Sequence, residues 1–536
     1  MLAVLAVATQ MLALIALPPA TAHIAIIGRA PRIVMSAGSP ELYLGVDAGT
    51  QSIKALLYDT KSKSVVGQGA VALDLNPTDV VGRAEQDPSV WVDAMYTACN
   101  EALAAAGESL GIDAAATGEC VRGMGVSGQQ HGLVALDSNY EVIRPAKLWC
   151  DTESSMEAAE LAEKFGWGVV SSFTCSKLLW LKRNEPDNFA RLAHVALPHD
   201  YLNYILCGNL IMECGDASGT GLLDTTLRQW DADAAREVDS SLLDKLPPLI
   251  GPTELAGKLQ PDAAAKLGLP TGVPVAPGGG DNMMSALGCG CNIQGRAAIS
   301  LGTSGVIFAK TAGAASDPSG AVCPFLDATG GGLPLLCTLN CATVPEEVRT
   351  AFGLSRDEIS ALAEAEPVGC EGLTLLPYFI GERTPNWPHA TGGLLGLRPG
   401  HLARPGLVYR AALESIAFSL RDGLDAMRQH GLPSDCDEVR LVGGGSKSAL
   451  WRQIIADALQ MKVACPTEPE SAALGAALQA AAVVAGVDDI GLWIESEHPT
   501  PVDESVAPNP EMAAAYETAF ALYAARGATL FADASA

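Results

Sequence analysis

Two similar segments half a chain apart constrain the fold of this 536-residue chain most strongly. Residues 42–59 read LYLGVDAGTQSIKALLYD, and residues 297–309 read AAISLGTSGVIFA. In each segment, two apolar runs flank a short polar turn that carries a Gly-Thr pair, which predicts a β-hairpin. Because the pattern recurs after about half of the chain, it predicts two related domains that face each other across a cleft.

The segments between and after these hairpins predict an α/β protein. Helical spacing of apolar residues alternates with short apolar strands, and the chain exceeds the size at which one core stops growing. We expect an N-terminal domain at 41–292, a C-terminal domain at 293–526, and a tail at 527–536 with little reason to be ordered. In the second half we expect helices at 406–430, 446–460, 471–485 and 511–525, a strand at 438–442 and a surface loop at 488–510.

The composition limits the classes of partner. The chain carries a net charge of −27, and we find no stripe of Lys and Arg with interleaved aromatic residues. Such a surface repels a phosphate backbone, so we expect no nucleic acid as a partner. A nucleotide can still bind if Mg²⁺, a local Lys and backbone N–H groups contact its phosphates. The 14 Cys residues lack the spacing of a zinc site, and we expect free thiols in a reducing compartment.

Residues 1–40 differ in composition from the rest of the chain. Met1–Gly28 contain no charged residue, two Arg residues follow, and the first acid is Glu41. This acid-poor, Arg-bearing segment predicts cleavable targeting to a plastid or mitochondrion. The alternatives are an unselected extension of a cytoplasmic protein and a membrane anchor, although Pro18–Pro19 interrupt the apolar run. We expect the mature domain to have no membrane partner.

The tips of the two hairpins have the chemistry of a phosphate site. In a tight glycine-containing turn, consecutive backbone N–H groups can point at one anion. The hydroxyl groups of Thr50, Ser52 and Thr303 add donors, and Lys54 adds a positive charge. Asp47, at the end of a buried strand, has the oxygen ligands for Mg²⁺. A plain hairpin turn without a ligand is the alternative for either tip alone, and the repeat argues against it.

Asp281 is the candidate catalytic residue. It follows an apolar strand at 273–276 and the glycine run Gly278–Gly280, and Asn282 comes next. The glycines allow close approach of the backbone and expose the Asp281 side chain, which can accept a proton from a hydroxyl nucleophile. The alternative is an Asp that only caps the helix expected at 283–288.

A second glycine run, Gly443–Gly445, lies between an expected strand and an expected helix. Bare backbone there allows a phosphate or a flat ring to rest on the turn, and Ser448 follows. The spacing does not match a Walker A loop. A glycine-rich turn that binds nothing is the alternative.

Two further polar segments are candidates for binding or for structure. The segment Ser127–Gly132 reads SGQQHG between two expected strands, where Gln130 and His131 can hydrogen-bond sugar hydroxyls; a structural His is the alternative. In the segment 378–385, we expect Glu382 and Arg383 to form an ion pair that holds a loop between the domains.

These motifs, in this order, resemble the FGGY family of carbohydrate kinases from about residue 42 to about residue 485. The resemblance implies two actin-like, ribonuclease H-like ATPase domains with the active site between them, ATP and Mg²⁺ as cofactors, and a sugar as substrate. The segments that carry it are Gly45–Ser52 (GVDAGTQS), Ser127–Gly132 (SGQQHG), Arg144–Trp149 (RPAKLW), Leu197–Leu202 (LPHDYL), Gly215–Thr220 (GDASGT), Gly278–Asn282 (GGGDN), Leu301–Gly305 (LGTSG) and Gly381–Pro385 (GERTP).

The resemblance also implies roles for individual residues. Asp281 matches the catalytic base, and Asp47 matches the metal-linked aspartate. The positions that match sugar contacts are Gln130, His131, Asp281 and Asn282. The positions that match the nucleotide site are Thr50, Ser52, Lys54, Thr303, Gly444, Gly445 and Ser448.

We therefore expect an ATP-dependent kinase that phosphorylates a terminal hydroxyl of a small ketose or another polyol. An actin-like ATPase that acts on a protein partner is the alternative from another class, and a homodimer stays open. The polar segment Ser127–Gly132 argues against that alternative, because such an ATPase has no need of it.

Overall fold

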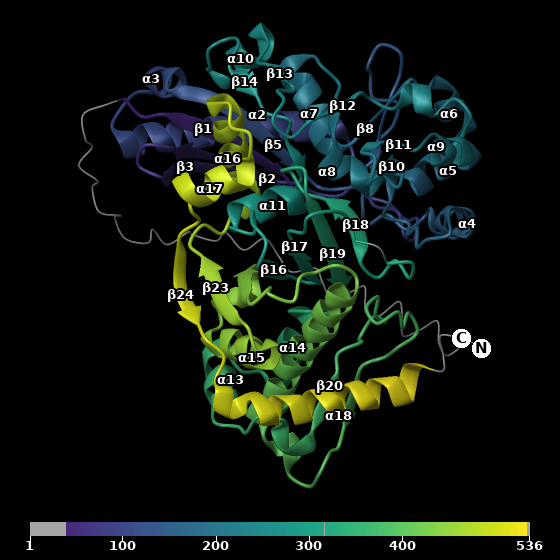
Figure 1. The fold of residues 1–536 in the computed structure, drawn as a ribbon, viewed down its shortest axis with the longest axis vertical. Helices are drawn as coiled ribbons and strands as arrows, with labels where there is room; N and C mark the ends of the chain where they lie inside the picture. The colour runs from purple at the N-terminus through teal and green to yellow at the C-terminus, as the bar shows by residue number, and fades with distance from the viewer. Residues whose placement is uncertain (1–38, 316, 533–536) are drawn as a thin grey trace. The chain divides into compact units, whose positions relative to one another are not determined.

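The computed structural model describes residues 39–315 and 317–532, which contain two seven-stranded mixed sheets (Figure 1). The first sheet has the order β13-β14-β5-β1-β2-β3, with β15 paired to β5. Its strands are β1 (Leu42–Ala48), β2 (Ser52–Asp59), β3 (Ser64–Ala72), β5 (Val121–Gly128), β13 (Gly257–Lys258), β14 (Pro274–Val275) and β15 (Gly279–Gly280).

The second sheet repeats this topology. Its order is β18-β19-β17-β16-β22-β23-β24, and its hairpin β16–β17 corresponds to β1–β2. In each sheet the hairpin's first strand pairs in parallel with the next, β5 or β22, and the last strand, β13 or β24, is antiparallel. The strands are β16 (Arg296–Leu301), β17 (Gly305–Ala309), β18 (Cys323–Leu326), β19 (Gly332–Thr338), β22 (Glu438–Val442), β23 (Lys462–Pro466) and β24 (Val502–Val506). The predicted α/β fold with a half-chain repeat is confirmed.

Helices cover the sheets. The long helix α2 packs closely on β3. At Gly67 the two backbones are so near that a Cβ atom would lie 2.3 Å from the Ala102 carbonyl oxygen. In the second half, α14 contacts β17 and β19. The principal helices are α2 (Pro88–Leu110), α4 (Ser155–Phe165), α5 (Thr174–Asn184), α7 (Pro198–Cys207), α8 (Cys214–Ala217), α11 (Asp281–Gly288), α12 (Thr343–Phe352), α13 (Arg356–Glu364), α14 (Pro405–Gln429), α15 (Ala449–Leu459), α16 (Ser471–Ala485), α17 (Ile490–Glu497) and α18 (Ala513–Phe531).

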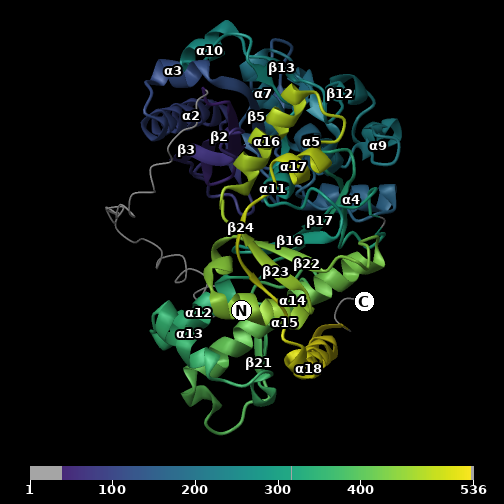
Figure 2. The same cartoon turned by 60° about the vertical axis from the view of Figure 1, so that its left-hand side comes forward.

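Helix α16 comes late in the chain but packs on the first sheet. It contacts β1 and β5, and it lies beside α11 in both views (Figures 1 and 2). The two helices meet backbone to backbone: a Cβ atom at Gly475 would lie 1.8 Å from the Met284 carbonyl oxygen, and one at Gly288 would lie 1.9 Å from that of Ser471. Only glycine allows this approach. The boundary between 292 and 293 stays a prediction.

Two predictions for the C-terminal part of the chain are wrong. The expected loop at 488–510 contains α17 and β24: Ile490 and Ile494, one helical turn apart, are buried, and β24 pairs with β23. The expected tail from 527 onward is helical to Phe531, because the Phe531 ring contacts Trp387 and α18 packs on the second half. Residues 533–536 lie outside the described residues.

The N-terminal and cysteine predictions have different outcomes. The targeting segment falls almost entirely on residues 1–38, which lie outside the described residues. All 14 Cys residues are described and are free thiols, as predicted. Across 39–315 and 317–532, no single helix has the length and apolar character to cross a membrane; α16 and α17 meet that test only as a pair bent by 103°.

The glycine contact between α11 and α16 leads to a stability prediction. Replacing Gly475 with Ala should destabilise the protein by about 1–3 kcal/mol, because the new methyl group must displace backbone rather than a flexible side chain. The midpoint of thermal unfolding, followed by circular dichroism, checks this. Gly393→Ala is the control, since a Cβ atom there meets nothing within 4 Å. Equal midpoints for the two variants would contradict the predicted backbone clash.

Candidate active site

The first sheet brings three polar strand ends together at one edge. Asp47 on β1 lies opposite Ser127 on β5, and Ser127 lies opposite Gly279 on β15, all in parallel register. The Ser127 hydroxyl donates a hydrogen bond of 3.0 Å to Asp47 Oδ1. Because β15 leads directly into α11, the sheet places Asp281 beside this edge. Ligand sites form at such carboxyl edges of parallel strands.

The glycine run before Asp281 is held from several sides. The Gln479 side chain, on α16, accepts from the Gly278 N–H at 2.9 Å and donates to the Gly278 carbonyl at 3.0 Å. The Asn203 amide donates to the Pro277 carbonyl at 2.8 Å. Gly278 has φ 78°, and a Cβ atom there would lie 2.4 Å from the Val126 carbonyl oxygen. The backbone therefore requires glycine at this position.

Asp281 is the first residue of α11, and Gly280 is the N-cap. The Asp281 carboxylate is partly exposed, and its Oδ1 accepts from the Asn282 N–H at 2.8 Å and from the Asn282 side chain at 3.0 Å. Burial and, next, the nearby carboxylates of Asp47 and Asp216 raise its pKa to about 8. A pKa near the operating pH lets a carboxylate take up a proton and release it again, as a general base must.

Asp47 and Lys54 face each other across the β1–β2 hairpin. Burial raises the pKa of Asp47, and the Ser127 hydrogen bond and the Lys54 charge offset part of that rise, so that the resulting pKa is about 6. Lys54 also forms an ion pair of 2.5 Å with Glu470, just before α16. The predicted phosphate-binding Lys is thus already paired within the protein.

The hydroxyl of Thr50 lies in a small polar network at the same turn. It donates to the Gln129 side chain and accepts from the Trp149 indole N–H, both at 2.9 Å. Ser52 begins β2 and is partly buried. The predicted nucleotide residues of the first half therefore share one turn with Asp47.

The predicted sugar-binding residues surround Asp281 on the same edge. The Asn282 side chain donates to Gln130 Oε1 at 2.8 Å. His131 Nδ1 lies 2.7 Å from the Gly219 carbonyl oxygen, so the ring donates there and leaves Nε2 as an acceptor. Burial lowers the pKa of His131 to about 3, with Lys177 contributing, so the ring is neutral. Its φ of 66° is rare for a residue with a side chain.

The predicted nucleotide residues of the second half share the corresponding edge of the second sheet. Thr303 lies in the β16–β17 turn, and Gly444 and Gly445 follow β22, which pairs with β16. A Cβ atom at Gly444 would meet nothing within 4 Å, so this backbone is open. The helix expected from 446 begins instead with a 3₁₀ turn, Gly444–Lys447, and Ser448 caps α15 by accepting from the Trp451 N–H.

Residues of the second half reach the first-half site. Burial raises the pKa of Cys337 on β19, and the charge of Asp281 adds to that rise. Arg383 adds to the lowering of the His131 pKa, after burial and Lys177. The Phe325 ring, on β18, lies 5.4 Å from the His131 ring, centroid to centroid. The site is therefore built from both halves of the chain.

The predicted ion pair between Glu382 and Arg383 is wrong. The Glu382 carboxylate accepts from backbone N–H groups, among them that of Leu339 at 2.7 Å, and from the Asn340 amide at 3.1 Å. The Arg383 guanidinium instead donates to the Cys323 sulfur at 3.5 Å. Glu382 provides hydrogen-bond acceptors for the backbone N–H groups of a buried turn, and the local sequence does not reveal this role.

Several buried polar residues near the site had no predicted role. His199 lies between Asp200 and Asp216, and all three are fully buried. Lys177 is also buried, and burial lowers its pKa to about 7. His199, Asp200 and Asp216 lie in the motifs at 197–202 and 215–220, and Lys177 directly precedes the apolar run at 178–181. In each case a polar residue beside or within an apolar run was the available signal.

One acidic cluster has the spacing of a metal site. Oxygens of Glu85, Asp151 and Glu153 lie within 4.8 Å of one another. The Lys147 ammonium lies between them, at 3.2, 2.9 and 2.5 Å. The lysine supplies the positive charge that a cation would supply, so this cluster is structural. Asp47 remains the predicted metal residue.

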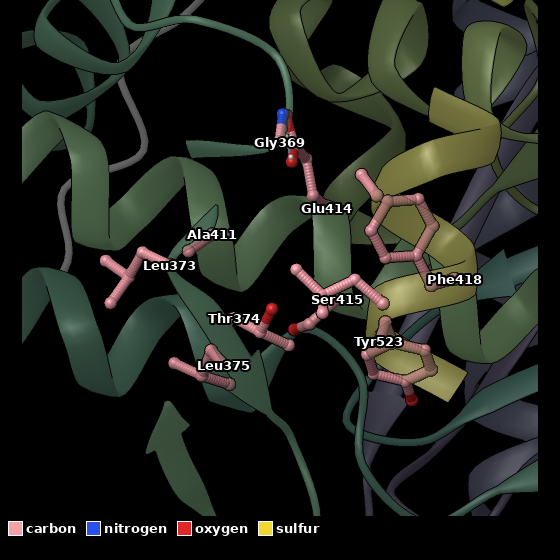
Figure 3. A pocket seen from close by; sticks show the side chains of 11 residues that line it. Gly369, Leu373, Thr374, Leu375, Ala411, Glu414, Ser415, Phe418 and Tyr523 are labelled. Carbon is pink, nitrogen blue, oxygen red and sulfur yellow. Dashed lines mark hydrogen bonds between the residues drawn. The ribbon is translucent and has the colours of Figure 1, made fainter. Parts of the chain in front are cut away.

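A cavity in the second half is too small to bind a sugar. It lies between α14, α18 and β20 (Thr374–Leu376), where the labelled Glu414, Phe418 and Tyr523 converge (Figure 3). Its volume is about 10 Å³, which is room for one water molecule. The elements that line it, α14, α18 and β20, carry none of the predicted site residues, so this cavity is separate from the active site.

The comparisons with known proteins cover both halves of the chain. Models of the FGGY family of carbohydrate kinases match residues 42–288 for the N-terminal domain and 297–484 for the C-terminal domain. The xylulose kinase of Haemophilus influenzae is 40% identical over 451 residues, which are 82% of this chain and 90% of that protein.

Solved structures agree over the same span. The xylulose kinase of Bifidobacterium adolescentis matches with a TM-score of 0.75 and 33% identity, over 90% of this chain and 99% of that one. The gluconate kinase of Lactobacillus acidophilus matches with a TM-score of 0.82 and 25% identity, over 92% and 98%.

The contact between Gln479 and the glycine run leads to a second stability prediction. In Gln479→Leu, the N–H and the carbonyl of Gly278 lose their buried partners, at a cost of about 1–3 kcal/mol each. The midpoint of thermal unfolding should fall clearly below that of the control Gln229→Leu, whose side chain is exposed. An unchanged midpoint would show that the glycine run does not depend on α16.

Proposed function

Because the chain belongs to the FGGY family of carbohydrate kinases, we propose that it phosphorylates D-xylulose to D-xylulose 5-phosphate, with Asp281 as general base. The kinases of this family use ATP, and the resemblance seen in the sequence motifs is confirmed. The identity of the sugar rests on the names of relatives such as the xylulose kinases of Haemophilus influenzae and Escherichia coli, at 40% and 34% identity. The observation that carries the mechanism is the Asp281 carboxyl group with its raised pKa, beside Asp47, Gln130 and Asn282.

Asp281 accepts the proton of the C5 hydroxyl as that oxygen attacks the γ-phosphorus of ATP in line. The new P–O bond forms as the bond to the β-phosphate oxygen breaks, which leaves ADP and the sugar phosphate. The transition state is loose, so positioning and charge matter more than basicity. The Asp281 carboxylate is positioned for this, because Asn282 holds one of its oxygens. Its side chain is also partly exposed and therefore within reach of a substrate.

The sugar is held by neutral groups. His131 offers Nε2 as an acceptor, because its Nδ1 proton is engaged by the Gly219 carbonyl. Asn282 and Gln130 present amide groups beside Asp281. Neutral donors and acceptors suit hydroxyl groups, which carry no charge for an ion pair to recognise.

The residues around Asp47 fit a magnesium ion and the phosphates of ATP. Asp47 is a partly buried carboxylate at a strand end, and the Ser127 hydroxyl occupies only its Oδ1. Bound Mg²⁺ would neutralise charge on the β- and γ-phosphates. Thr50, Ser52 and Lys54 would contact the phosphates from the first half, and Thr303, the open backbone of Gly444 and the adjacent Gly445 from the second; Ser448 already caps α15. Lys54 must exchange its pairing with Glu470 for a phosphate oxygen.

Replacing Asp281 with Asn tests the base. The amide keeps the shape and cannot accept the proton, so kcat should fall by about 10²- to 10⁴-fold while sugar binding persists. Coupled ADP release measures kcat, and calorimetric titration with D-xylulose measures binding. Asp59→Asn, a buried acid far from the site that accepts from the Glu41 and Ser62 N–H groups, is the control for burial. Near-normal turnover of Asp281→Asn would exclude it as the base.

A substrate panel tests the sugar. ADP release should depend on added sugar, and kcat/KM should be highest for D-xylulose among D-xylulose, D-ribulose, sedoheptulose, gluconate and glycerol. A pocket that hydrogen-bonds hydroxyl groups discriminates strongly against analogues that lack them. A higher kcat/KM for another sugar would change the substrate and leave the kinase chemistry in place. ADP release at the full rate without sugar would contradict the proposal.

A further inference from the structure

A line of buried polar side chains runs from α7 to Asp281. Its first link is His199, whose Nδ1 lies 2.8 Å from Asp216 Oδ2 and whose Nε2 lies 3.0 Å from Asp200 Oδ1. Burial alone would lower the pKa of His199, but the two carboxylates outweigh it and raise the pKa to about 9. The ring is therefore an imidazolium, and it holds one oxygen of Asp216 in place.

The second link joins Asp216 to Gln130 around Gly280. Within the described residues, Asp216 Oδ1 and Gln130 Nε2 are each buried with no hydrogen-bond partner within bonding geometry. Both side chains converge on one point: a Cβ atom at Gly280 would lie 2.7 Å from Gln130 Cγ and 3.0 Å from Asp216 Oδ1. Burial raises the pKa of Asp216, while His199 and, to a smaller extent, the Gln130 amide lower it, as donors directed at a carboxylate do.

The third link determines which way each amide faces. A carboxylate only accepts, so Gln130 must turn Nε2 toward Asp216 and Oε1 away from it. Oε1 then accepts from Asn282 Nδ2 at 2.8 Å, and the same Nδ2 donates to Asp281 Oδ1 at 3.0 Å. The charge on Asp216 thus sets the donor and acceptor directions of two amides in succession.

We propose that Asp216 is a positioning residue for the phosphoryl transfer: through Gln130 and Asn282 it fixes the orientation of the Asp281 carboxylate. Asp216 itself is fully buried and touches no substrate. Gln130 has a role in this line that an apolar side chain of the same size could not take. The inference rests on the proposed role of Asp281 as base.

The test is a double-mutant cycle between Asp216→Asn and Gln130→Met. Asp216→Asn can present a donor to Gln130, so the amides can reverse and Asn282 no longer donates to Asp281. Gln130→Met keeps the volume and breaks the line. Each variant should lower kcat by about 10- to 100-fold. For Asp216→Asn the affinity for D-xylulose, measured by calorimetry without ATP, should change much less, because Asp216 is fully buried. The double variant should be no slower than the slower single variant, because both remove one connection.

The controls separate positioning from folding. Asp59→Asn removes another buried acid and should leave kcat unchanged, and thermal unfolding is measured for every variant. If Asp216→Asn does not fold, His199→Leu replaces it in the cycle, since Asp216 without a cation takes up a proton when buried.

Three results would overturn or redirect the inference. A normal kcat for Asp216→Asn, or losses in kcat that multiply in the double variant, would show that the line does not orient Asp281. A rise in the KM for sugar with kcat unchanged would make Asp216 part of the sugar site instead. If Asp281→Asn itself keeps full turnover, the proposed base fails, and that failure is seen independently of the cycle.

Discussion

The structure depends on a pair of buried hydrogen bonds between Gln479 and Gly278. They join a helix of the second half, α16, to the glycine run that carries Asp281. The same helix meets α11 through Gly475 and Gly288, where no side chain fits between the backbones. Because these contacts are short and rigid, the position of Asp281 is tied to α16 as firmly as to its own sheet.

This attachment allows the protein to keep several acids close together. Burial raises the pKa values of Asp47, Asp216 and Asp281, and the charges of Asp47 and Asp216 also raise that of Asp281, which costs stability. The His199 cation offsets part of that cost for Asp216, and Lys54 does so for Asp47. A flexible loop would relax until the carboxylates separated. The clamped glycine run prevents this and keeps Asp281 close to Asp47 and Asp216.

The site also shows how one fold serves two substrates. The first sheet presents Asp47 and the side chains proposed to bind the sugar at its carboxyl edge, and the second presents Thr303 and an open glycine turn at the equivalent edge. The two edges have the same topology but different side chains. The ring contact of Phe325 with His131 connects the second half to the first-half edge.

Much of the local structure followed from the sequence because local patterns decide it. Both hairpins have the predicted strands, and the strand at 438–442 and the helix at 471–485 have the predicted bounds. The pattern of an apolar strand, glycines and an Asp indicated Asp281 correctly as a residue that the backbone exposes. The prediction of a loop at 488–510 was wrong, because the strand β24 forms through pairing with β23 and local composition does not encode a distant partner.

The sequence by itself determined the repeated hairpins, the glycine turns and the acids that follow them, since these depend on neighbours within a few residues. Only the tertiary structure decided that Gln479 holds Gly278 across 201 positions, that Ser448 caps a helix, and that Glu382 serves a backbone turn rather than Arg383. It also decided that the side chains of Asp216 and Gln130 converge at Gly280. Each of these depends on which buried donors and acceptors meet after the chain has folded, and the free energy of those encounters is absent from any local pattern.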